Sequence, residues 1–378
     1  MLRRISLVVL IFASFLLRSV AQQLSQDAKI AVVTVEPGKE LYDVFGHSLL
    51  WIYDPSLGID QAYSWGGYDF STPNFYGKFV RGTLPYRMSY ATLAQNQDYY
   101  QRENRGMTLQ ELRLSPAQKQ AIFDEIQAQY NDPDRRIYPY KFFFDNCATR
   151  VRDAVLIAVK DTNNLIQDNN LAGQSYRQWM NKCLTRGHQD WAAVGMNMAL
   201  GLPSDEKVGP YKACYLPENL EAALRTAKVP VVANEIPLFQ TFPKEDNSTP
   251  FLQSPSFIFS LFLIFTIFIS YKNRKANKGF TLFDKILFGL VGFIGWFLFF
   301  LGVGTDHGVT NWNLNLLWAF PLHIPLAFTV KDKAKYFKLT SILIVISLFF
   351  VAGYSFDLLL FVLPILVRSI YHATGKNA

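Results

Sequence analysis

The hydrophobic pattern divides the chain into two parts. From residue 251 onward Phe, Leu, Ile and Val dominate, and the only acids are Asp284, Asp306, Asp332 and Asp357. Apolar runs of roughly twenty residues are typical of helices that cross a bilayer. We expect five spans, at about 252–271, 283–303, 313–330, 337–353 and 356–371. The last three are short or contain proline.

The charges between these spans alternate from loop to loop. Residues 272–278 and 331–338 carry four Lys or Arg each, whereas 304–311 and 352–355 carry none. Because cytoplasmic loops collect Lys and Arg, this alternation places the N-terminal part of the protein outside the cytoplasm and the C-terminus inside.

A leader and a linker bound the first part of the chain. Residues 1–21 have basic residues near the start, an apolar core and small residues before Ala21. This pattern predicts a signal peptide cleaved after Ala21, with an uncleaved anchor as the alternative. We expect an exported domain at 22–229, a proline-rich linker at 230–251 and the membrane domain at 252–378.

The exported part mixes strand and helix signals. Ser115, Pro116 and Gln118 form a helix start with a capping box. We expect strands at 29–35, 48–53, 61–65 and 137–144, and a further helix at 148–160. The fold class predicted for this domain is therefore α+β.

Composition and charge remove several classes of protein. The chain is 50% hydrophobic, 15% aromatic and 18% charged, which excludes a disordered, collagen-like or small disulfide-rich protein. The net charge of the chain is +7, and its excess of positive charge lies in the leader and the membrane region. Residues 22–250 carry 23 Lys and Arg against 26 Asp and Glu, so we expect no nucleic-acid partner.

Cysteine is the candidate nucleophile. Cys183 and Cys214 either form a disulfide or are two buried thiols. Cys147 differs, because it follows an aromatic segment at the start of a predicted helix that Asp145 or Asn146 can cap. A helix N-terminus and a nearby imidazolium favour the thiolate, which is the nucleophilic form of the side chain.

His47 is the candidate general base. It follows Gly46 at the start of an apolar strand, and a thiol needs a nearby imidazole to take its proton and return it to the leaving group. His188, in a polar stretch, is the competing histidine. The residues around His47 show no metal-ligand pattern, and we expect neither a metal nor a cofactor.

These residues carry a resemblance to known families. Gly46-His47 opens a strand, and Asp145-Asn146-Cys147-Ala148-Thr149-Arg150 opens a helix about one hundred residues later. This arrangement resembles the circularly permuted papain-like fold. NlpC-type enzymes place Cys before His, whereas here His comes first, as in lecithin:retinol acyltransferase-like proteins.

The fuller resemblance is to the bacterial Lnb-type lipoprotein N-acyltransferases, and it spans most of residues 28–370. The short motifs that support it lie at 64–70, 73–75, 81–82, 200–205, 215–217 and 311–318. One departure concerns a second histidine, which lecithin:retinol acyltransferase-like proteins have about twelve residues after the first. Ile59 stands there, so the residue that orients His47 is Asp60, Tyr63 or Ser64.

The resemblance implies a reaction and its partners. A fatty acyl chain would move from a phospholipid to Cys147 as a thioester, and then to the α-amine of a diacylglyceryl-cysteine lipoprotein. It implies the bacterial inner membrane, with the catalytic domain in the periplasm. Asn146 is a candidate for stabilising the oxyanion, and His307 and Trp312 are candidates for lining the lipid entry.

Two other functions fit parts of the sequence. NlpC-type domains in the cell envelope commonly cleave peptidoglycan, so a peptidase or amidase is one alternative. The other is a non-catalytic envelope scaffold, in which Cys147 and His47 are structural.

Overall fold

A seven-stranded antiparallel sheet forms the centre of the N-terminal domain, with strand order β6-β4-β3-β2-β1-β5-β7. The computed structural model describes residues 22–159, 169–242 and 248–375, so the predicted signal peptide lies outside the described residues. The strands are β1 Lys29–Val35, β2 His47–Asp54, β3 Ile59–Gly67, β4 Pro85–Ala91, β5 Met107–Leu112, β6 Ile137–Pro139 and β7 Val232–Phe239.

Helices cover both faces of this sheet, which explains why its central strands are apolar on both sides. Ile30 and Val32 of β1 pack in the core that also contains α4 and α6, whereas Ala31 and Val33 pack with Tyr100 of α3. The strands predicted at 29–35, 48–53 and 61–65 are confirmed, and the domain is α+β.

The helices of the N-terminal domain vary from one turn to about four. They are α2 Phe75–Val80, α3 Leu93–Arg102, α4 Pro116–Asn131, α5 Pro133–Arg136, α6 Cys147–Val159, α8 Tyr176–Arg186, α9 Asp190–Ala199, α10 Pro210–Ala213 and α11 Pro217–Arg225, with short 3₁₀ turns η1 Asn169–Leu171 and η2 Leu202–Asp205. The predicted capping box at the start of α4 is confirmed: the hydroxyl of Ser115 accepts from the backbone N–H of Gln118.

Two predicted segments differ in the structure. The aromatic segment 137–144 is a strand only as far as Pro139, because a turn from Lys141 to Asp145 redirects the chain into α6. The predicted linker 230–251 contains β7, which pairs with β5. The prolines of this segment, Pro237 among them, had indicated a linker. A proline fits in β7 because an edge strand has one side without a partner strand, where the missing N–H is not needed.

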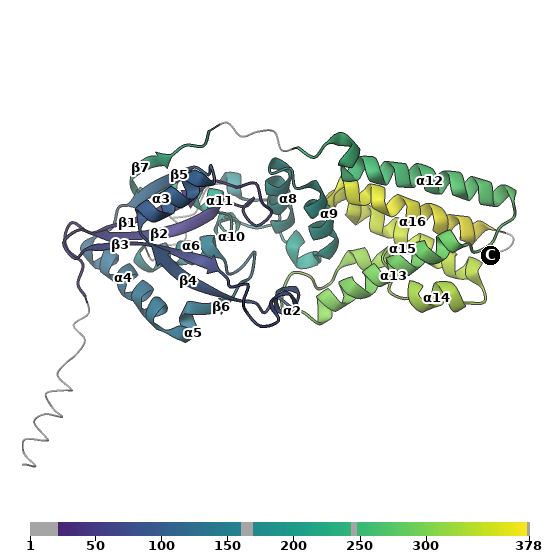
Figure 1. Ribbon diagram of the computed structural model, residues 1–378, viewed down its shortest axis with the longest axis horizontal. Coiled ribbons are helices and arrows are strands. Elements are labelled where there is room, and N and C mark those ends of the chain that lie inside the picture. The colour runs from purple at the N-terminus through teal and green to yellow at the C-terminus, as the bar shows by residue number, and fades with distance from the viewer. Residues whose placement is uncertain (1–21, 160–168, 243–247, 376–378) are drawn as a thin grey trace, which may run out of the picture.

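The second domain is a bundle of apolar helices. Its elements are η3 Phe251–Gln253, α12 Pro255–Lys275, α13 Leu282–Val303, η4 Leu314–Leu317, α14 His323–Thr329, α15 Lys333–Tyr354 and α16 Phe356–Thr374. Four of them, α12, α13, α15 and α16, are long and apolar enough to cross a membrane. Figure 1 shows the sheet at one end of the molecule and these four helices at the other, with α8 and α9 between.

The third predicted span, 313–330, is not one continuous helix, so among the described residues four of the five expected spans are long helices. The segment still runs along the bundle, because Asn315 contacts α9 at one end and Phe328 packs on Phe280 at the other. Proline residues interrupt it. Non-helical backbone is tolerated within the hydrocarbon region of a membrane where it is surrounded by protein. Gly295 of α13 provides the room, since a Cβ there would lie 2.1 Å from the carbonyl oxygen of Ala319.

The connection between α13 and α14 joins the two domains. Val309 is buried in the same apolar core as Cys147. The side-chain amides of Asn313 and Asn315 donate to carbonyl oxygens at the end of α9, at 2.8 and 3.0 Å from Met198. A Cβ on Gly201 would lie 1.7 Å from the carbonyl oxygen of Asn311, so this contact needs glycine.

A fully buried ion cluster ties three long helices together. The guanidinium of Arg368 on α16 donates to both carboxylate oxygens of Asp284 on α13, at 2.6 and 2.7 Å. It also donates to Ser270 on α12, and His372 Nε2 lies 3.0 Å from Asp284. Because every charge has a partner, the cluster can exist inside an apolar bundle.

Candidate active site

Asn146 caps the helix that begins with Cys147. Its side-chain oxygen accepts from the backbone N–H of Thr149 at 2.9 Å, and the hydroxyl of Thr149 accepts from the backbone N–H of Asn146 at 2.8 Å. The amide nitrogen of Asn146 donates to the carbonyl oxygens of Phe142 and Tyr215. Both the oxygen and the nitrogen of the side-chain amide therefore have partners within the protein, so in this structure Asn146 acts as a helix cap and has no free N–H to offer an oxyanion.

Cys147 lies buried in the first turn of α6, with 6% of its surface exposed. Burial raises the pKa of its thiol to about 11, although backbone N–H groups of Ser48, Ala148 and Cys147 itself reach the sulfur and oppose that shift. The neutral thiol is therefore favoured over the thiolate in this environment. Burial disfavours the charged thiolate more strongly than the backbone N–H groups at the helix N-terminus stabilise it.

His47 is held on the sheet beside this helix. Its Nε2 atom lies 2.8 Å from the hydroxyl oxygen of Ser64 on β3, which leaves Nδ1 to exchange a proton. Burial, and then the charge of Arg105, lower the pKa of His47 to about 4. The imidazole is thus neutral at neutral pH, as a base must be.

His47 and Cys147 lie close together, because the backbone N–H of Ser48, the residue after His47, reaches the sulfur of Cys147. Among the side-chain hydrogen bonds of the described residues, none joins His47 directly to Cys147. Catalytic hydrogen bonds often form only when substrate is bound, so this geometry is compatible with a pair that closes during the reaction.

Asp60 is not the residue that orients His47. Its carboxylate accepts from the indole N–H of Trp51 at 2.7 Å and from the backbone N–H of Leu93 at 3.1 Å, which joins β2, β3 and α3. Asp60 is four residues from Ser64 along β3, a separation of about 13 Å at the usual rise per residue. Ser64, one of the three alternatives in the sequence, makes the contact with the imidazole.

Arg105 is a buried cation that sequence reasoning missed. It donates to Asp43 at 2.6 Å and to the carbonyl oxygen of Glu36 at 2.9 Å. Its Nη2 atom is buried and has no hydrogen-bond partner among the described residues. Its charge lowers the pKa of both His47 and Cys147. An arginine just after a polar helix gives no signal of this position, which only the tertiary fold creates.

The outer loop after α13 packs against the N-terminal domain close to this site. His307 Nε2 lies 2.8 Å from the carbonyl oxygen of Val80, and Asp306 pairs with Lys141 at 2.7 Å. Gly308 lies beside Phe144, three residues before Cys147. His307 therefore has a docking contact, whereas Trp312 is 78% exposed.

Comparison with known families agrees with this architecture. The model of the Lnb N-terminal periplasmic domain matches residues 20–182, and that of the Lnb transmembrane domain matches residues 245–377. Together they cover more than three quarters of the chain. The chain belongs to the Lnb family. No curated protein and no solved structure matches it.

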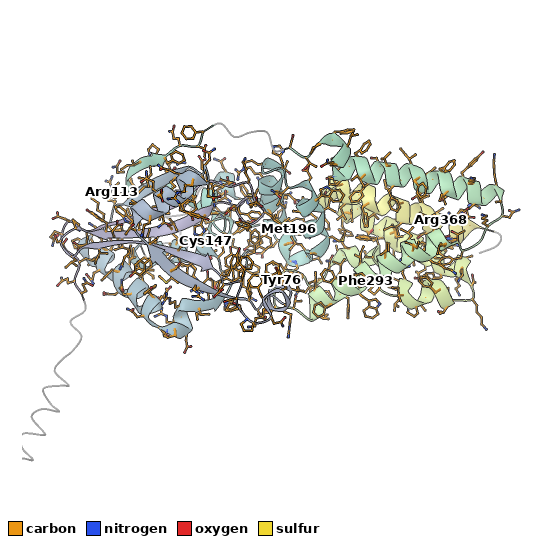
Figure 2. All side chains as sticks on the ribbon, viewed as in Figure 1. Tyr76, Arg113, Cys147, Met196, Phe293 and Arg368 are labelled. Atoms are coloured by element: carbon orange, nitrogen blue, oxygen red, sulfur yellow. The ribbon has the colours of Figure 1, made fainter. Side chains whose placement is uncertain are left out.

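Membership of the Lnb family makes this a membrane protein that processes lipoproteins and carries a periplasmic domain. The helical bundle is its transmembrane domain, and the sheet with α6 belongs to the periplasmic side. Figure 2 shows Cys147 between the sheet and Met196 of α9, and the backbone N–H of Ser48, next to His47, reaches its sulfur.

All three cysteines of this Lnb protein are free and buried. The open alternative for Cys183 and Cys214 is thus decided in favour of two separate thiols. Cys183 lies 3.9 Å from the carboxylate of Glu218. No group of three His, Cys, Asp or Glu within 22–159, 169–242 and 248–375 is arranged to hold a metal ion.

The protonation states predict how Cys147 reacts with a small alkylating reagent. Below a pKa of about 11 the thiolate fraction rises about tenfold per pH unit. Alkylation by iodoacetamide, located by peptide mass, is therefore expected to accelerate steadily through about pH 9. A plateau reached near pH 6 would contradict this, since it would indicate a resting thiolate–imidazolium pair. Cys147→Ala provides the blank.

Proposed function

We propose that this Lnb protein transfers a fatty acyl chain from a phospholipid, through a thioester on Cys147, to the α-amine of a diacylated lipoprotein in the bacterial inner membrane. The observation that carries the proposal is the position of Cys147. Its sulfur lies at a helix start among backbone N–H groups, on the end of the sheet against which the outer membrane loop packs.

In the first half of the reaction, Cys147 attacks the ester carbonyl carbon of a phospholipid. The thiol proton passes to Nδ1 of His47, while Ser64 holds the other ring nitrogen. Backbone N–H groups at the start of α6 stabilise the negative charge that develops on the carbonyl oxygen. The C–O bond then breaks, the alcohol takes the proton from His47, and a lysophospholipid leaves.

In the second half, the lipoprotein amine attacks the thioester. An α-amine has a pKa near 7.7–8.0, so a useful fraction is unprotonated at neutral pH. The amine gives a proton to His47, the C–S bond breaks, and the thiol of Cys147 regains the proton. The products are an amide on the lipoprotein and free enzyme.

Burial of the site supports transfer rather than hydrolysis. Phe143, Val309 and Cys147 lie in one apolar core, so little water reaches the sulfur. Excluding water protects a thioester until the amine arrives. A neutral thiol and imidazole also suit such a site, because charges form only when substrate is in place.

The test is the intact mass of the purified protein after incubation with phospholipid vesicles and no lipoprotein. We expect a gain of one fatty acyl group that hydroxylamine removes and that Cys147→Ala lacks. Adding a diacylated lipopeptide should discharge the adduct and acylate the peptide. A folded protein that forms no adduct would overturn the proposal and direct attention to peptidoglycan fragments as substrates.

A further inference from the structure

Exposed aromatic side chains gather around α2, on the N-terminal domain. We call Tyr68, Phe70, Phe75, Tyr76 and Phe79 the α2 patch. Phe70, Tyr76 and Phe79 are 69%, 76% and 54% exposed. The rings of Tyr68, Phe70, Phe75 and Tyr76 contact one another; the centroid of Phe75 lies 4.9 Å from that of Phe70 and 5.4 Å from that of Tyr76. A contiguous exposed patch of this kind indicates an interaction surface.

The α2 patch is held at the outer end of a membrane helix. α13 ends at Val303, and three residues later the backbone N–H of Asp306 donates to the carbonyl oxygen of Arg81 at 2.8 Å. A Cβ on Gly82 would lie 3.0 Å from the backbone nitrogen of His307, so the loop approaches this glycine closely as well. Figure 2 shows Tyr76 at the junction of the two domains. The patch therefore lies where the apolar span stops.

The same aromatic surface continues inward to the site. Tyr68 packs on Tyr86 at 5.5 Å, and Tyr86 stacks on Tyr140 at 4.6 Å. Tyr140 lies near Cys147, since a thiolate there would raise the pKa of the Tyr140 hydroxyl. A series of ring contacts thus leads from the α2 patch to Tyr140, in the direction of the nucleophile.

We propose that the α2 patch inserts into the headgroup layer of the bilayer and receives the phospholipid whose acyl chain reaches Cys147. This inference rests on the proposed function for its last step. Aromatic rings favour the membrane–water interface. Lys78 and Arg81, in the same segment, add positive charge that attracts anionic headgroups.

A bilayer is the occupant that the structure favours, because the patch continues an existing lipid-facing surface. Val303 and Phe300 at the end of α13 are 70% and 42% exposed on a helix that is long and apolar enough to cross a membrane. The α2 patch lies next to the end of α13, because Arg81, directly after α2, accepts a hydrogen bond from Asp306. A protein partner would have to bind beside the headgroups without displacing them.

Photocrosslinking of the full chain tests this placement. A benzoylphenylalanine residue replaces Tyr76 or Phe79 in Cys147→Ala protein, reconstituted in phosphatidylethanolamine–phosphatidylglycerol vesicles. After illumination we expect an adduct with the mass of a whole phospholipid. Leu57, in the turn between β2 and β3 at the opposite end of the sheet, is the matched control and should give a several-fold lower yield.

Two outcomes would overturn the inference. One is an equal lipid yield at positions 57, 76 and 79; the other is a co-reconstituted lipoprotein captured at 76 and 79 in place of lipid. Crosslinking needs no thiol, so it stays informative if no thioester ever forms. With Cys147 restored, Phe70→Ser with Tyr76→Ser and Phe79→Ser should slow thioester formation from vesicles several-fold, whereas Tyr99→Ser should not.

Discussion

Replacing His47 by glutamine is expected to slow thioester formation on Cys147 by a factor of about 10²–10⁴, the usual contribution of a positioned general base. Glutamine can keep a hydrogen bond to Ser64 but cannot accept a proton from the thiol. The measurement is the time course of the acyl adduct by intact mass. The resting pKa of about 4 means that wild-type His47 stays neutral, and competent, across the neutral range.

Two matched variants separate proton transfer from orientation. Ser64→Ala removes one hydrogen bond to the imidazole and should slow the reaction by up to about tenfold, the equivalent of roughly 1.4 kcal/mol. Asp60→Asn should leave the rate near that of the wild type, because its carboxylate contacts Trp51 and Leu93. If Asp60→Asn were as slow as His47→Gln, the assignment of Ser64 would be wrong.

Replacing Arg368 by methionine is expected to lower the stability of the membrane domain by about 3–5 kcal/mol, because it leaves the fully buried carboxylate of Asp284 with one charged partner fewer. Thermal unfolding in detergent measures the loss. Lys338→Met, an exposed charge on the same side of the bundle, is the control and should change little.

A double variant tests the cause. Asp284→Leu combined with Arg368→Met removes both charges, and should recover much of the stability lost in the single variant, since an apolar pair needs no solvation. A double variant less stable than Arg368→Met alone would show that hydrogen bonds to Thr281 and Ser270 matter more than the paired charges.

Local signals predicted the parts of the fold that local chemistry controls. The capping box at Ser115 and the apolar strand at 29–35 each depend on neighbouring residues, and both are confirmed. β7 escaped detection because an edge strand can include Pro237 while its partner, β5, lies more than one hundred residues earlier. The broken third span escaped because its support comes from Gly295 on another helix.

The same division applies to the site. The order of His47 and Cys147 and the helix start at Asn146 are visible in the sequence. The protonation state of Cys147 cannot be predicted from the sequence, because it depends mainly on burial. That burial involves residues far away in the chain, such as Val309. Arg105 likewise approaches both His47 and Cys147 only after α3 has packed on the sheet.

Val309 belongs to the membrane domain in sequence but to the core of the N-terminal domain in space. A soluble fragment cut before α12 would lack this side chain, and its core would have a hole within the cluster that contains Cys147. The carbonyl groups at the end of α9 would lose Asn313 and Asn315 as well. Excision would therefore change the site itself, so enzymology on this protein calls for the intact chain in a lipid or detergent environment.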